Sequence, residues 1–136
     1  MKPPDQVKRE FVEQWLAKAE DDLRAAQDML AEGRPYRCII CYHAQQATEK
    51  YVKAYLVHRD VEPPRVHDLA DLLRVLASTN PALADRLHEV RSLSPYAVDA
   101  RYPADSPTPT AEEARHAVRL AATARQAVLG SLQAQT

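Results

Sequence analysis

The stretch that decides the fold is residues 37–54, which read RCIICYHAQQATEKYVKA. It contains neither proline nor glycine, the two residues that most often interrupt a helix. Small or apolar side chains recur at alternating steps of four and three, at Ile40, Ala44, Ala47, Tyr51 and Ala54. This spacing places them on one face of an α-helix. A neighbouring strip is also apolar, so we predict a helix over about 35–59 at the centre of a bundle.

The same spacing predicts further helices over about 5–32, 67–78, 81–93 and 110–132. No segment alternates with period two, so we expect no sheet. Helices joined by short turns favour one all-α domain over residues 1–136, an up-and-down helical bundle of four principal helices plus a shorter fifth. Residues 94–109 hold four prolines and no helical period, which predicts a long surface loop. On the first helix, the solvent-facing side is predicted to carry Glu13, Lys18, Glu20, Asp21 and Arg24.

Composition narrows the class of protein. The chain has 136 residues, of which 46% are hydrophobic and 27% charged, a composition that suits one globular domain with its own core. Its formal net charge of −1 argues against a protein that grips duplex DNA by general electrostatics. No apolar run is long enough to cross a bilayer, and the N-terminus lacks the apolar core of a signal peptide. We therefore expect a cytoplasmic protein without a membrane partner.

Two cysteines, Cys38 and Cys41, form a Cys-Ile-Ile-Cys sequence. This spacing is half of a typical zinc site, but the chain has no second pair to complete it. We interpret the two thiols as small buried groups on an apolar helical face. No metal site and no cofactor are predicted.

The same helix carries a polar group made of Gln46, Glu49, Lys50 and Lys53. Glu49 precedes Lys53 by four residues, the favoured order for a helical ion pair worth about 0.2–0.5 kcal/mol. A solvated, ion-paired face would explain all four residues, and ligand contact is the alternative. Gln45 lies beside the apolar arc, where a buried amide needs hydrogen-bond partners in the bundle or across a dimer.

Four motifs occur in a fixed order along the chain: WLAKAEDDLRAA at 15–26, HAQQATEKYVKA at 43–54, RVHDL at 65–69 and ARYP at 100–103. This order resembles the HEPN family (higher eukaryotes and prokaryotes nucleotide-binding domain) over about 11–128. The resemblance implies a helical bundle that commonly forms a homodimer and associates with a nucleotide or RNA. It also implies a minimal nucleotidyltransferase as partner, in a toxin–antitoxin-like pair. Many members of the family are metal-independent RNases marked by an arginine and a following histidine.

Arg37 and His43, separated by five residues, fit that signature and are the candidate catalytic residues. A histidine can act as general acid or base, and an arginine can hold a phosphate. RNA supplies its own 2′-hydroxyl nucleophile, so no metal is required. The step from Arg37 to His43 turns a helix through about 600°, which leaves the side chains roughly 120° apart. They can meet only if Arg37 lies in an irregular first turn, or across a dimer.

The remaining candidate ligand contacts come from the polar group and from three other places. The set is Gln46, Glu49, Lys50, Lys53, Arg65, His67, Arg101 and Tyr102. His67 can instead fix the loop before its helix. Arg101 and Tyr102 can hold a phosphate and stack on a base, or brace the long loop.

The sequence contains no Gly-rich phosphate loop, zinc-protease motif or nucleophile elbow. The interpretation that the HEPN resemblance implies is a nucleotide- or RNA-associated module that partners a nucleotidyltransferase. The alternatives are a metal-independent endoribonuclease with its Arg–His pair at a dimer cleft, and a structural dimerisation domain. Whether the protein is an enzyme stays open at this point.

Overall fold

A computed structural model describes residues 2–66, 68–97 and 107–134. Within these residues the chain is helical and contains no strand, which confirms the predicted all-α fold. The elements are α1 (Pro4–Ala31), α2 (Arg37–His58), α3 (Leu69–Thr79), α4 (Pro81–Arg86), the 3-10 helix η1 (His88–Ala97) and α5 (Ala111–Ala134). None of the described helices combines the length and the apolar character needed to span a bilayer.

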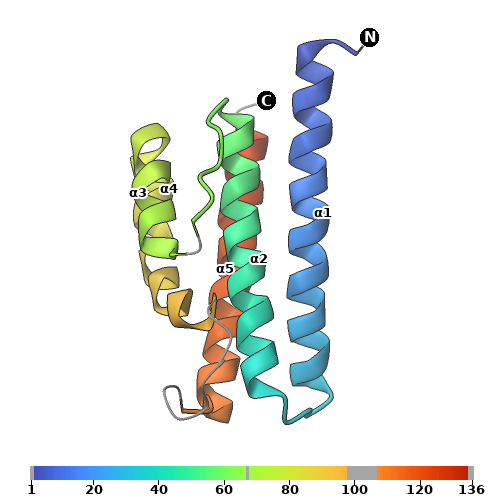
Figure 1. Cartoon of the computed structure of the whole chain (residues 1–136), viewed down its shortest axis with the longest axis vertical. Helices are drawn as coiled ribbons and strands as arrows, with labels where there is room; N and C mark the ends of the chain where they lie inside the picture. The colour runs from blue at the N-terminus through green and yellow to red at the C-terminus, as the bar shows by residue number, and fades with distance from the viewer. Residues whose placement is uncertain (1, 67, 98–106, 135–136) are drawn as a thin grey trace.

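Helix α2 is the centre of the molecule. In Figure 1, α1, α2 and α5 run side by side along the long axis, while α3, α4 and η1 lie on the side away from α1. Helix α2 contacts α1, α5, η1 and α3. Fourteen of its 22 residues are buried, far more than a helix with only one covered face would bury. The prediction that residues 37–54 form the central helix is therefore confirmed.

The helix boundaries follow from local sequence. At the start of α5, the Thr110 hydroxyl accepts from the Glu113 backbone N–H (3.0 Å), and the Glu113 carboxylate accepts from the Thr110 N–H (2.9 Å). These two reciprocal hydrogen bonds form a capping box. Asp68 caps α3 by accepting from the Ala70 N–H at 2.8 Å. After α1, Gly33 adopts a φ of 69°, the left-handed conformation in which glycine ends a helix without strain.

The predicted helix over 81–93 is wrong in its type and in its end. Helix α4 ends at Arg86, and η1 continues to Ala97, so it includes Pro95 and the first residues of the predicted loop over 94–109. Leu87, Val90 and Leu93 are each 1% exposed. A step of three residues keeps these side chains on one side of a helix with three residues per turn, which explains why this segment tightens.

Candidate functional site

A cluster of three polar side chains joins α1 to a partly exposed face of α2. The Asp22 Oδ1 atom of α1 lies 2.8 Å from His43 Nδ1, and its Oδ2 atom accepts a hydrogen bond from Lys50 Nζ. His43 and Lys50 are seven residues apart on α2, so they lie on the same helical face. Their side chains are 31% and 24% exposed, compared with 13% for Asp22. One carboxylate therefore fixes an imidazole and an ammonium group that both reach solvent.

The cluster has a definite chemical capacity. When His43 donates its Nδ1–H to Asp22, its Nε2 keeps a lone pair and can accept a proton or a hydrogen bond. A carboxylate that orients a histidine in this way is a common arrangement for general acid–base chemistry. The Tyr42 ring meets the His43 ring edge to face, with centroids 5.6 Å apart. Lys50 retains two further N–H donors, which suit a phosphate oxygen.

Arg37, the other candidate catalytic residue, lies apart from this cluster within one chain. It is the first residue of α2 and its side chain is exposed. Asp22 is the residue that hydrogen-bonds with His43. The helical first turn leaves the two side chains on different faces, as the six-residue step predicts. The joint role of Arg37 and His43 stays a prediction that requires a second chain.

Two members of the polar group on α2, Glu49 and Lys53, form an ion pair that is buried. Lys53 Nζ donates to Glu49 Oε1 at 2.7 Å, as the spacing predicts. Yet Glu49 is only 3% exposed and Lys53 only 8%, so a fully solvated face is wrong for this pair. The Lys53 ammonium lies 5.6 Å from the centre of the Trp15 ring of α1, a cation–π contact. Gln46 Nε2 donates to Gln45 Oε1 at 2.7 Å, which gives the buried Gln45 amide a partner of the kind it needs.

Among the other predicted ligand contacts, Arg65 is exposed in the segment after α2. His67, Arg101 and Tyr102 lie outside the described residues. Their roles stay predictions. No group of three or more histidine, cysteine, aspartate or glutamate side chains in the described ranges could hold a metal ion.

The two cysteines differ in burial. Cys41 is fully buried, and burial raises the pKa of its thiol to about 11 although a hydrogen bond with Tyr96 acts in the other direction. Cys38 is exposed, so the prediction of two buried thiols is wrong for this residue. Cys38 lies in the first turn of α2, before the helix enters the core.

A second cluster, which the sequence does not reveal, joins α1, α2 and α5. Glu20 Oε1 accepts from the Tyr51 hydroxyl at 2.5 Å and from Arg125 Nε at 2.6 Å. Burial alone would raise the pKa of Glu20, but these two hydrogen bonds and the nearby guanidinium charges lower it below its usual value. Burial, and then the hydrogen bond to Glu20, raise the pKa of the Tyr51 phenol. Glu20 was predicted to face solvent, but its ionised carboxylate links α1 to α2 and α5.

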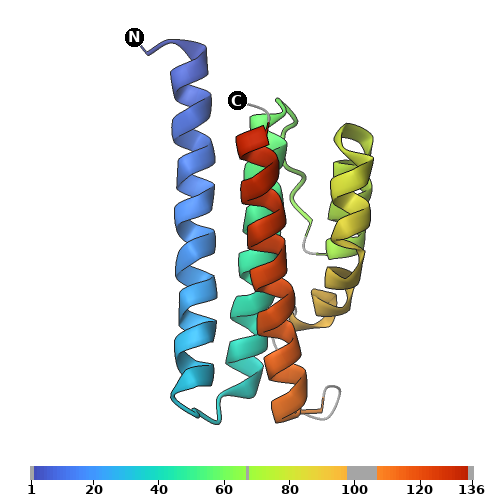
Figure 2. The ribbon, with the colours of Figure 1, turned by 180° about the vertical axis from the view of Figure 1, so that it is seen from behind.

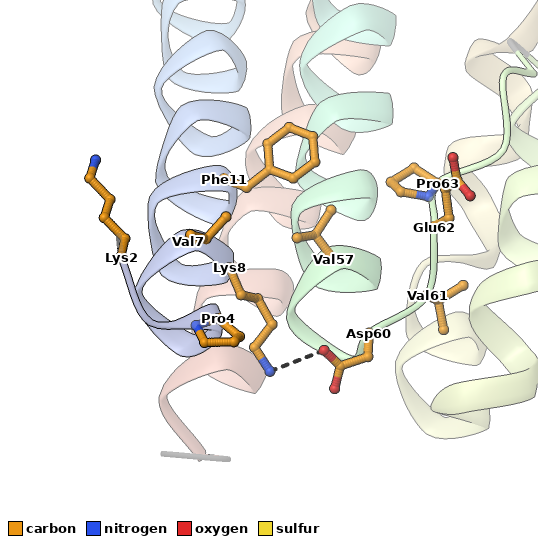
Figure 3. Close-up of a pocket in the computed structure, with 10 residues that line it drawn as sticks. All are labelled: Lys2, Pro4, Val7, Lys8, Phe11, Val57, Asp60, Val61, Glu62 and Pro63. Atoms are coloured by element: carbon orange, nitrogen blue, oxygen red, sulfur yellow. Dashed lines mark ion pairs between the residues drawn. The ribbon is translucent and has the colours of Figure 1, made fainter.

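An apolar groove lies at the other end of α2 from Arg37. Figure 3 shows Val7 and Phe11 of α1 near Val57 of α2, with an ion pair between Lys8 and Asp60 at the rim. The ion-paired atoms are 3.3 Å apart, and the groove has a volume of about 830 Å³. Val7 and Phe11 are 50% and 47% exposed. The groove is a surface separate from the Asp22–His43–Lys50 cluster.

The architecture is that of a small helical-bundle domain built around one buried central helix. The HEPN domain family matches over residues 12–131. Among solved structures, the chain is similar to ST0689, an archaeal HEPN homologue, with a TM-score of 0.70 and 27% identity over 89% of this chain and 97% of that one. It is also similar to TT1696 from Thermus thermophilus, with a TM-score of 0.71 and 29% identity over 88% of this chain and 96% of that one.

No curated protein matches the chain. The family match covers most of the sequence, and the chain therefore belongs to the HEPN domain family. The family resemblance read from the four motifs is confirmed.

Proposed function

We propose that this protein is a nucleotide- or RNA-associated HEPN module whose ligand contacts the face of α2 that carries His43 and Lys50. The observation that supports the proposal is the Asp22–His43–Lys50 cluster, in which one carboxylate holds two partly exposed nitrogen groups in place. Phosphate oxygens accept from lysine and from a protonated imidazole. Gln46, half-buried on the same face, adds an amide that can contact a sugar or a base. The net charge of −1 favours a local contact of this kind over a broad basic surface.

The test is a binding titration with a fluorescent single-stranded RNA of mixed sequence. We expect Lys50→Gln and His43→Gln to weaken binding about tenfold each, because each removes one charge-assisted contact. Arg9→Gln is the matched control, since Arg9 is an exposed cation of α1 remote from the cluster. A parent protein that binds no RNA and no nucleotide would leave the structural dimerisation domain as the better account. Equal binding by all variants would place the ligand elsewhere.

The proposed protein partners are a second copy of the chain and a minimal nucleotidyltransferase. Membership of the HEPN family supports both, and exposed apolar side chains around the start of α2 support the second copy. Tyr36, Ile39 and Tyr42 are 50%, 48% and 37% exposed, and a dimer that covered them would bring neighbouring Arg37 close to the partner. Sedimentation of the parent and of Ile39→Glu tests the dimer: the parent should sediment as a dimer and the variant as a monomer. Co-purification with a nucleotidyltransferase encoded by a neighbouring gene tests the other partner.

The second candidate function is a metal-independent endoribonuclease with a composite site. The Asp22–His43 pair favours it, because an oriented, partly exposed imidazole is a competent acid or base. His43 would take the proton of the 2′-hydroxyl, whose oxygen attacks the phosphorus and displaces the 5′-oxygen of the next nucleotide, which takes a proton from water. Arg37 of the partner subunit would stabilise the negative charge that develops on the phosphate. Incubation with transfer RNA in the presence of a chelator should then give cleavage by the parent. Both Arg37→Ala and His43→Ala should be inactive.

Mixing the two inactive variants gives the sharper result. If Arg37 and His43 come from different chains, half of the randomly assorted dimers contain one intact site, which restores about a quarter of the parent activity. If the mixture stays inactive while the parent cleaves, the two residues do not form a composite site. If the parent leaves RNA intact, the binding-module proposal stands alone.

A further inference from the structure

A small polar pocket lies between α1 and α5, the two long helices that Figure 2 shows beside each other from behind. Its volume is about 290 Å³, which can hold a phosphate group with part of the molecule that carries it. The polar side chains around it are Glu20, Arg24 and Gln27 of α1 and Arg125 and Gln126 of α5. None of these residues belongs to the Asp22–His43–Lys50 cluster.

Glu20 positions one of the two arginines. Arg125 donates its Nε–H to Glu20 Oε1 at 2.6 Å, and the Tyr51 hydroxyl donates to the same oxygen at 2.5 Å. Tyr51 is fully buried, so this arrangement is anchored in the core. A guanidinium carries four more N–H donors on its two terminal nitrogens. Arg125 can therefore keep its contact with Glu20 and still present donors to a ligand.

Arg24 supplies a positive charge that no carboxylate neutralises directly. It is exposed, and within the described ranges it forms no ion pair. Its charge attracts Glu20 and contributes to the low pKa of that carboxyl. The lining thus holds two guanidinium groups and one carboxylate, which leaves one positive charge in excess. Asp21 and Asp28 neighbour Arg24 on α1, but neither lines the pocket.

We propose that this pocket is a binding site for a small oxyanion, a phosphate or carboxylate group held between Arg24 and Arg125. Arginine forks match both anions with paired hydrogen bonds. The side-chain amides of Gln27 and Gln126, both exposed at the pocket, add neutral N–H groups that can donate to a bound anion. The bound anion connects α1 to α5 and stabilises their contact. This site is independent of the RNA contact proposed at His43.

The direct test follows the arginine Nε–Hε resonances of the full chain in ¹H–¹⁵N spectra. Inorganic phosphate, acetate and chloride are titrated separately at matched ionic strength. We expect saturable shifts of Arg24 and Arg125 with phosphate or acetate, and no saturable shift of Arg9. The better of the two anions identifies the chemistry of the ligand group. Shifts no larger than those given by chloride would overturn the proposal.

Variants locate the site without disturbing the core. Arg24→Gln should weaken anion binding about tenfold, the loss expected for one charge-assisted contact. Gln27→Glu introduces a carboxylate at the pocket and should weaken it at least as much by repulsion. Gln14→Glu, at an exposed glutamine of α1 outside the pocket, is the matched control and should bind as the parent does. Parent-like affinity in both pocket variants would refute the site, whereas His43→Gln should leave it intact.

Discussion

Glu20 and Asp22 of α1 are only two residues apart, yet their carboxylates bond to different parts of the molecule. Glu20 receives hydrogen bonds from Tyr51 of α2 and Arg125 of α5. Asp22 receives both of its bonds from α2, from His43 and Lys50. Each carboxylate thus has two donors from outside its own helix. One donor to Glu20, the Tyr51 hydroxyl, is fully buried and the other, Arg125, is 41% exposed, whereas both donors to Asp22 are partly exposed.

That difference separates a structural group from a chemical one. Tyr51 is fully buried, and its raised phenol pKa together with the lowered Glu20 pKa keeps both groups in one protonation state near neutral pH. His43 and Lys50 are 31% and 24% exposed, so a ligand can reach the nitrogen atoms that Asp22 does not use. The buried hydrogen bond to Tyr51 therefore ties Glu20 to the core, whereas Asp22 is bonded only to side chains that reach solvent. The predictions below separate these two roles by stability and by binding.

The largest expected effect on stability comes from Glu20→Ala. It leaves the buried Tyr51 hydroxyl without its acceptor and releases Arg125, which should lower the free energy of unfolding by about 2 kcal/mol. Urea denaturation followed by circular dichroism measures the change. Asp21→Ala, at the exposed residue between the two carboxylates, is the control and should change stability by less than about 0.5 kcal/mol. Equal losses of unfolding free energy in Glu20→Ala and Asp21→Ala would show that Glu20 has no special structural role.

A somewhat smaller loss is expected for Tyr51→Phe. The substitution keeps the ring in the core and removes only the hydroxyl that donates to Glu20, so it should cost about 1 kcal/mol. The double variant with Glu20→Ala should be less destabilised than the sum of the two single variants, because both remove the same hydrogen bond. Additive losses in this cycle would show that the short contact contributes little.

The sequence predicts the bundle well because helical periodicity is a local property. Residues 37–54 carry a four-three pattern over five turns, and the structure buries that pattern at the centre. The capping box at Thr110 and Glu113 lies within one turn, so it too can be read directly. The pair of Glu49 and Lys53 is likewise visible from its spacing, although its burial depends on Trp15 from another helix.

The clusters around Glu20 and Asp22 are harder to predict, because the residues that form each cluster are distant from one another in sequence. Glu20 and Arg125 are 105 residues apart, and no spacing rule connects them. From α1 alone, Glu20 stands at the edge of the apolar stripe and is indistinguishable from a solvent-facing acid. Asp22 belongs to the motif at 15–26 that carries the HEPN resemblance, and this motif was the signal that could have singled it out. Its bonds to His43 and Lys50 depend on how α1 and α2 pack together.

Asp22→Ala should have a modest effect on stability and a larger one on binding. Both of its partners reach solvent, so water can replace the lost hydrogen bonds, and the expected cost in unfolding free energy is about 0.5–1 kcal/mol. Because His43 and Lys50 lose the carboxylate that holds them in place, the affinity of Asp22→Ala for single-stranded RNA should fall, as it should in His43→Gln and Lys50→Gln. Urea denaturation and the fluorescence titration measure the two effects on the same samples. A large stability loss with unchanged RNA affinity would reverse the roles assigned to Asp22 and Glu20.

The smallest expected effect is a pH dependence that comes from Glu20. Its folded-state pKa lies below the ordinary value of 4.5, so the ionised carboxylate stabilises the fold above pH 4.5, and this contribution is lost as the pH falls through the folded-state pKa. Glu20→Gln removes the titration, while its amide oxygen can still accept from Tyr51. The difference in melting temperature between the parent and Glu20→Gln should therefore be largest near neutral pH and shrink below 4.5. A difference that stayed constant across this range would mean that the charge of Glu20, as distinct from its hydrogen-bonding oxygen, does not stabilise the contact between α1 and α5.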